Sequence, residues 1–114
     1  MNGCIFCAIA AHQAPATFVH EDDAVIAIRD NNPQAPVHVL VLPREHIASA
    51  AELSGDHAEL WSRMLAVAQD VARADGIADR GYRLVANIGR DGGQTVAHLH
   101  VHVLGGRHMT WPPG

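Results

Sequence analysis

The chain has 114 residues, 48% of them apolar, and a formal net charge of -4. This length suits a single domain over residues 1–114 with a modest core and is too short for two. No apolar run approaches the length of about 20 residues that a membrane span needs, and the basic residues are too dispersed to form a nucleic-acid groove. We therefore expect a cytoplasmic protein that binds neither membrane nor nucleic acid.

All eight basic residues are arginine. Mechanisms that need a lysine, such as a Schiff base or a P-loop, are therefore excluded. The remaining candidate nucleophiles are histidine, cysteine, serine, threonine and carboxylates. A small anionic ligand stays possible where local donors hold it.

The first predicted element is a short helix or turn over residues 3–11, where apolar residues recur at helical spacing. The only two cysteines, Cys4 and Cys7, share a face of it. A CxxC pair supplies half of a tetrahedral zinc site and needs two further ligands from elsewhere. Cysteines that only pack, or a redox pair, are the alternatives. A thioredoxin-like pair follows a strand, and position 4 leaves no room for one.

Two strands, at residues 17–21 and 24–29, are predicted to form a hairpin around an acidic turn. Residues 30–36 are rich in turn formers and lead into a further strand at residues 37–42. His38 lies inside that alternating strand, and we expect it to be a hydrogen-bonded histidine on the face of the sheet.

A long amphipathic helix is predicted to begin near Gly55, with Ser54 as its cap. Gly76 suits the left-handed position that ends such a helix. The apolar stripe should cover one face of the sheet, because it repeats at spacings of three and four: Leu60, Trp61, Met64, Leu65, Ala68, Val71 and Ala72.

The last two predicted strands span residues 81–87 and 98–104 and should pair antiparallel. In the second, three histidines alternate with apolar residues, so His98, His100 and His102 should line one face. One metal ion cannot easily take all three, because the outer two lie roughly 13 Å apart on a strand that rises about 3.3 Å per residue. The other face should be filled by Leu99, Val101 and Val103.

Residues 98–104, with the sequence HLHVHVL, resemble the histidine-triad pattern, and residues 105–114 resemble the tail of the histidine triad nucleotide-binding (Hint) branch. The likeness extends over nearly the whole chain. It implies an α+β, HIT-like fold: an antiparallel sheet of about five strands with one long helix and a short N-terminal helix. It also implies a homodimer that pairs through the long helix and an adjacent strand, with Trp111 able to reach the partner's site.

The same resemblance implies a metal site. In Hint relatives that keep the CxxC pair, two histidines complete a zinc site, and the matching positions here give Cys4, Cys7, His46 and His98. Two thiolates and two imidazoles form a closed structural site with no position open to water. Zinc in such a site would stabilise the fold and take no part in the chemistry.

A nucleotide site is implied as well. Asp30 precedes a Pro-Gln-Ala-Pro-like stretch, where the family binds the ribose, although by itself such an aspartate predicts only a turn cap. Thr95 stands where most Hint proteins have a serine beside the leaving group. The expected nucleotide-binding residues are Asp30, Asn31, Asn87, Gly93, Gln94, Thr95, His100 and His102.

A neutral imidazole is a good nucleophile near pH 7. Its central place predicts His100 as the nucleophile toward phosphorus, with His102 donating to a phosphate oxygen and His98 orienting His100 through its carbonyl. The resemblance implies hydrolysis of the P–N bond of purine nucleoside phosphoramidates, with no cofactor for catalysis. The alternatives are diadenosine polyphosphate hydrolysis or nucleotidyl transfer, and a zinc-stabilised nucleotide-binding interaction module.

Overall fold

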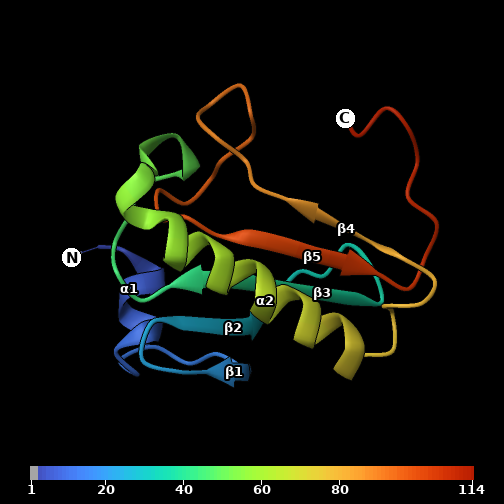
Figure 1. Ribbon diagram of the computed structural model, residues 1–114, viewed down its shortest axis with the longest axis horizontal. Coiled ribbons are helices and arrows are strands. Elements are labelled where there is room, and N and C mark those ends of the chain that lie inside the picture. Colours follow the sequence, from blue (N-terminus) through green and yellow to red (C-terminus); the bar gives the residue numbers. More distant parts are fainter. Residues whose placement is uncertain (1–2) are drawn as a thin grey trace.

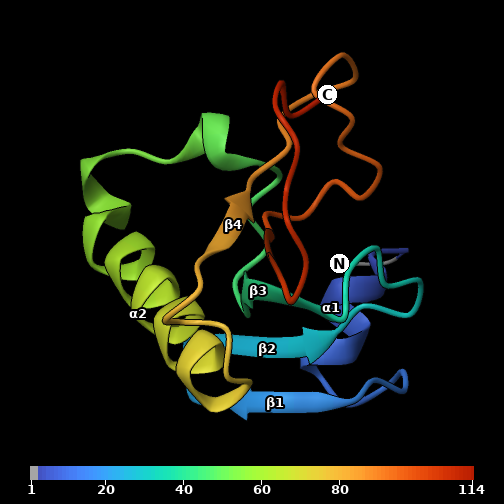
Figure 2. The same ribbon diagram turned by 90° about the vertical axis from the view of Figure 1, so that its right-hand side faces the viewer.

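The computed structural model describes residues 3–114 and contains one antiparallel sheet with helices on both faces (Figures 1 and 2). The five strands lie in the order β1-β2-β3-β5-β4. This confirms the expected fold class. The elements are α1 (Ile5–Ala10), β1 (Phe18–Glu21), β2 (Val25–Arg29), β3 (Val37–Pro43), η1 (Ala50–Glu52), η2 (Gly55–His57), α2 (Ala58–Ala74), β4 (Tyr82–Val85) and β5 (Val101–Gly105).

The long helix α2 crosses one face of the sheet (Figure 1). The predicted stripe is largely confirmed, although Val67 is buried and Leu65 is only half-buried. The helix begins three residues later than expected, because Ser54 caps the 3-10 turn η2, which then continues into α2. Gly76 has a φ of 76° just beyond its end. No helix within residues 3–114 has the length and apolar character needed to cross a membrane.

The short helix α1 packs on the opposite face of the sheet, as the view in Figure 2 shows. Phe6, Ile9 and Ala10 bury their side chains against β2 and β3. The alternation along these strands explains the two layers: in β2, Val25 faces α2 and Ile26 faces α1. The site described below lies in the α1 layer.

The histidine segment differs from the expected strand in its length. The β5 ladder begins only at Val101, opposite Val41, so His98 and His100 precede the strand. The chain before the ladder is instead held by single hydrogen bonds, such as Leu99 N–H to the Ile47 carbonyl at 2.6 Å. The alternation still holds, because Leu99, Val101 and Val103 enter the α2 core while the histidine rings cluster on the other side.

Candidate active site and metal centre

A cavity of about 250 Å³ lies between α1 and the sheet, next to the histidines. One part of its wall is apolar and comes mainly from α1, β2 and β3. The other part is polar and holds the chemistry-bearing groups. The apolar residues are Ile5, Phe6, Ile9, Pro15, Ala16, Ile28, Leu40 and Val96, and the polar ones are Arg29, Asp30, Asn31, Thr95, His100 and His102.

The ring of His100 is oriented by the main chain. Its Nδ1 lies 2.7 Å from the His98 carbonyl oxygen, which can only accept, so Nδ1 carries the proton. In the neutral ring, Nε2 then bears a lone pair. His100 is 8% exposed and lines the cavity, and the edge of Phe6 packs against it with ring centroids 5.1 Å apart. The buried ring therefore has one nitrogen fixed and the other available as a nucleophile.

His102 is polarised by a second histidine that the sequence analysis assigned only to the face of the sheet. The Gln34 N–H donates to His38 Nδ1 at 3.0 Å, so His38 Nε2 carries the proton and donates to His102 Nδ1 at 2.9 Å. His102 Nε2 must then carry a proton. Asp30 lies 3.4 Å from His38 Nε2. The relay therefore keeps His102 neutral with an N–H on its remaining nitrogen.

Burial explains why these rings stay neutral. Burial, together with the nearby His100 and His38, lowers the pKa of His102 to about 4. Burial also lowers the pKa of His38, against the opposing charge of Asp30. The register of β3 and β5 could have revealed this pair, since Leu40 lies opposite His102 and His38 is two residues away on the same face.

The structure brings together Asp30, Asn31, Thr95, His100 and His102 around the cavity, but not the other expected nucleotide contacts. The Asn87 amide donates to the Gly92 carbonyl at 2.7 Å, and Gly93 has a φ of 80° in the same loop. The Gln94 amide nitrogen donates to the carbonyls of Ala48 and Val96. These three residues shape the loop that leads to Thr95, and their contact with a nucleotide stays a prediction.

The four expected metal ligands converge. All four ligand atoms of Cys4, Cys7, His46 and His98 lie within 4.8 Å of one another. Cys4 Sγ is 3.3 Å from His98 Nδ1, and Cys7 Sγ is 3.3 Å from His46 Nδ1. Zinc bonds of about 2.3 Å to sulfur and about 2.0 Å to nitrogen separate the two atoms by about 3.5 Å across a tetrahedral angle. The donor set therefore fits a tetrahedral metal.

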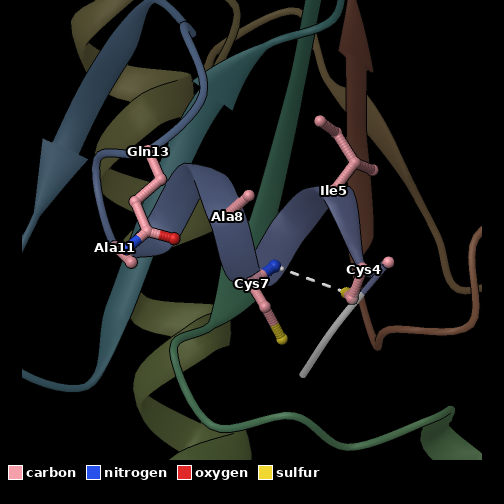
Figure 3. A pocket seen from close by; sticks show the side chains of 7 residues that line it. Cys4, Ile5, Cys7, Ala8, Ala11 and Gln13 are labelled. Carbon is pink, nitrogen blue, oxygen red and sulfur yellow. Dashed lines mark hydrogen bonds between the residues drawn. The ribbon is translucent and has the colours of Figure 1, made fainter.

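The tautomer of His98 agrees with this fit. Its Nε2 donates to the Pro43 carbonyl at 2.8 Å, so the lone pair is on Nδ1, which faces the two sulfurs. Burial lowers the pKa of this fully buried ring. The CxxC pair lies at the start of α1, where the Cys7 N–H donates to Cys4 Sγ at 3.3 Å (Figure 3). Burial and the neighbouring Cys4 raise the pKa of the Cys7 thiol.

A second group of three possible ligands consists of Asp30 and His102, which line the cavity, and His38 behind them. Its chemistry argues against a metal. Because the Gln34 N–H occupies His38 Nδ1, Nε2 must give up its proton before it can bind a cation. These residues therefore act as a hydrogen-bonded relay.

Comparison with known proteins gives the family. A model described as scavenger mRNA decapping enzyme C-term binding matches residues 3–111. The crystal structure of a HIT family hydrolase from Legionella pneumophila Philadelphia 1 matches with a TM-score of 0.97 and 49% identity, over 98% of this chain and 100% of that one. The chain belongs to the histidine triad (HIT) family. The resemblance seen in the sequence is confirmed.

Two curated relatives bear on the chemistry of this HIT protein. The purine nucleoside phosphoramidase of Escherichia coli strain K12 is 45% identical over 105 residues, which cover 92% of this chain and 88% of that protein. The 14 kDa zinc-binding protein of Zea mays is 46% identical over 112 residues, which cover 96% of this chain and 87% of that protein. One relative is therefore named for a reaction and the other for a metal.

Proposed function

We propose that this HIT protein hydrolyses the P–N bond of purine nucleoside phosphoramidates. The observation that carries the proposal is the His100 ring, whose Nδ1–H is fixed on the His98 carbonyl and whose Nε2 lone pair is free beside the cavity. The similarity to the Escherichia coli phosphoramidase supports the choice of bond. The apolar wall suits a purine ring, and Asp30 suits the hydroxyls of a ribose.

The reaction takes two displacements at phosphorus. His100 Nε2 attacks and forms an N–P bond while the substrate's P–N bond breaks, and the departing nitrogen takes up a proton to leave as the amine. The Thr95 hydroxyl lines the same cavity and is suited to pass that proton. Water then attacks phosphorus, the His100–phosphorus bond breaks, and the nucleoside monophosphate leaves with His100 neutral again.

The charge that builds on the phosphate oxygens needs donors, because the described cavity wall has no lysine and its arginine, Arg29, is paired with Asp75. His102 supplies one through the Nε2–H that the His38 relay maintains. A neutral donor set in a buried site holds such charge without reorganisation. Catalysis therefore depends on both the nucleophile and the relay behind its neighbour.

We also propose that zinc occupies the Cys4, Cys7, His46 and His98 site, which the zinc-binding maize relative supports. When bound, the metal supplies a four-way cross-link between α1, the turn after β3 and the histidine segment, with no position open for water. The nucleophile keeps its orientation through a backbone carbonyl.

The test compares the wild type with His100→Ala on AMP joined to a primary amine through a P–N bond, with AMP release measured by chromatography. The variant should lose at least about a thousandfold in kcat/KM, because the covalent route is gone. His12→Gln is the matched control, since His12 is an exposed histidine outside the cavity. Equal rates for wild type and His100→Ala would overturn the proposal.

The same assay separates the alternatives. Faster turnover of diadenosine polyphosphates than of the AMP conjugate would point to the polyphosphate-hydrolysing reaction. Tight AMP binding without turnover of either substrate would point to a nucleotide-binding module.

A further inference from the structure

The two residues enclosed by the CxxC pair, Ile5 and Phe6, both line the cavity assigned to the nucleotide. Phe6 also places its ring edge against His98 and His100, with centroids 5.8 and 5.1 Å apart. The first turn of α1 therefore serves two sites, since its thiols face the metal ligands and the residues between them form the wall of the active site.

We propose that Cys4 and Cys7 are a site of reversible oxidative modification, at which hydrogen peroxide joins them in a disulfide, the metal site loses two ligands and the nucleotide cavity loses affinity. The oxidation itself is independent of the proposed function. Its effect on nucleotide binding rests on that function.

The pairing of the thiols follows from the sequence and the geometry. The chain has only two cysteines, and their sulfurs lie within 4.8 Å of each other. Both residues are half-buried, whereas His98 is fully buried. A second cavity, of about 450 Å³, lies along α1 and is lined by both cysteines but not by Phe6 (Figure 3). A small oxidant can therefore approach the sulfurs without entering the nucleotide cavity.

The chemistry balances with hydrogen peroxide as the oxidant. One thiol takes an oxygen atom from the peroxide and becomes a sulfenic acid, and the other peroxide oxygen leaves as water. The sulfur of the second cysteine then displaces the new hydroxyl as a second water, and the S–S bond forms. The protein loses two hydrogen atoms, and a dithiol reductant restores them.

The disulfide changes the geometry of the turn. Two sulfurs on one tetrahedral zinc ion lie about 3.8 Å apart, given bonds of about 2.3 Å. In a disulfide they lie about 2.05 Å apart. The two sulfurs must therefore approach each other, which places strain on the turn that carries Ile5 and Phe6 between them. Ile5 is the residue that lines both cavities, so a shift there reaches the nucleotide directly.

The experiment treats zinc-loaded protein with a small excess of hydrogen peroxide and makes three measurements. Intact mass should fall by about 2 Da, which identifies a disulfide within one chain. A chromogenic chelator should detect release of the zinc, and calorimetry should show AMP binding weakened by about tenfold, a typical size for coupling between two sites. A dithiol reductant with added zinc should reverse all three changes.

Two variants keep the result interpretable. Cys4→His leaves a nitrogen ligand in place of sulfur and only one thiol, so peroxide should neither release zinc nor weaken AMP binding. If that variant fails to bind zinc, the double variant Cys4→Ser with Cys7→Ser replaces it. The double variant should show no change of mass by 2 Da, and its AMP affinity should be the same before and after peroxide.

Several outcomes would overturn the proposal. These are a gain of oxygen mass without a disulfide, a disulfide between two chains on a non-reducing gel, retention of the zinc, or an internal disulfide that leaves AMP affinity unchanged. If the untreated protein binds no AMP, the proposed function fails instead, and the mass and zinc measurements still decide whether the thiols pair.

Discussion

The tautomer of each histidine in the site is set, directly or through one further ring, by a main-chain group that can only donate or only accept a hydrogen bond. A backbone carbonyl fixes His100, a backbone N–H begins the chain that fixes His102, and a second carbonyl fixes His98. Side chains alone could not give this certainty, because an imidazole facing another imidazole can adopt either tautomer. The main chain therefore decides which nitrogen of His100 is free, which nitrogen of His102 donates and which nitrogen of His98 faces the cysteine sulfurs.

His38 gives the first test at this scale. His38→Leu removes the donor to His102 Nδ1 and leaves the Gln34 N–H without its acceptor. We expect kcat to fall by about tenfold or more, because His102 loses its fixed tautomer. His38→Gln, which offers both an acceptor and a donor, should recover part of the loss. Steady-state kinetics on the AMP–amine conjugate measures both, and an unchanged kcat in the leucine variant would refute the relay.

The pH dependence of stability gives the second test. The folded pKa of His102 lies near 4, well below its ordinary value of 6.5. Between these values the unfolded chain binds more protons, so the free energy of unfolding should decrease as the pH falls through that window. In metal-free protein, urea unfolding between about pH 6.5 and 4 should show this slope, and His102→Gln should make it shallower, with His38 and His98 contributing what remains.

Among the elements, the position of β5 is restricted by close packing at its last residue. Its last residue, Gly105, is buried, and a Cβ built there would lie 2.6 Å from Ile77 Cδ1 and 3.1 Å from Ile77 Cβ. The glycine therefore lets the segment after α2 lie directly on the end of the strand that carries His102. This contact and the β3 ladder together fix the strand's position.

Gly105→Ala tests that contact. Because the added methyl meets a packed side chain, we expect it to lower the free energy of unfolding by about 1–3 kcal/mol. Gly55→Ala is the control, since nothing lies within 4 Å of a Cβ at that position and its φ is not in the left-handed region. Denaturant unfolding of both variants decides the point, and equal stabilities would show that Ile77 gives way at little cost.

The periodicity of the chain predicted the sheet, both helices and the division of the histidine segment into a core side and a chemical side. It made the last two strands too long. Residues 81–87 were predicted where the structure has β4 at Tyr82–Val85, and residues 98–104 where it has β5 at Val101–Gly105. Local alternation cannot show where the pairing with a partner strand stops, and the pairing of β3 with β5 stops at Val41 opposite Val101. His38 was correctly predicted as a hydrogen-bonded histidine on the sheet face, but its contact with His102 was missed because that contact depends on register.

For the whole molecule, dimerisation through α2 and an adjacent strand stays a prediction, and the exposed edge of the sheet suggests β4 as that strand. β4 is an edge strand of four residues, and its Leu84 is 39% exposed. An unpaired apolar edge favours association. Light scattering with size exclusion should show a dimer for the wild type, and Leu84→Asp should shift it toward the monomer. Val19 lies on the opposite edge strand, β1, and is exposed to a similar degree. Val19→Asp should therefore leave the molar mass of the dimer unchanged. A monomeric wild type would contradict the expectation.

The contact between His100 and the His98 carbonyl has an evolutionary consequence. A carbonyl oxygen is present whatever residue stands at position 98. The imidazole proposed to bind the metal can therefore be replaced while the acceptor that orients the His100 ring is kept. A lineage can therefore abandon the cysteine–histidine cross-link, or acquire it, without redesigning the reaction. The metal site and the reaction can therefore evolve separately, although the ring and the carbonyl of the same residue, His98, serve one each.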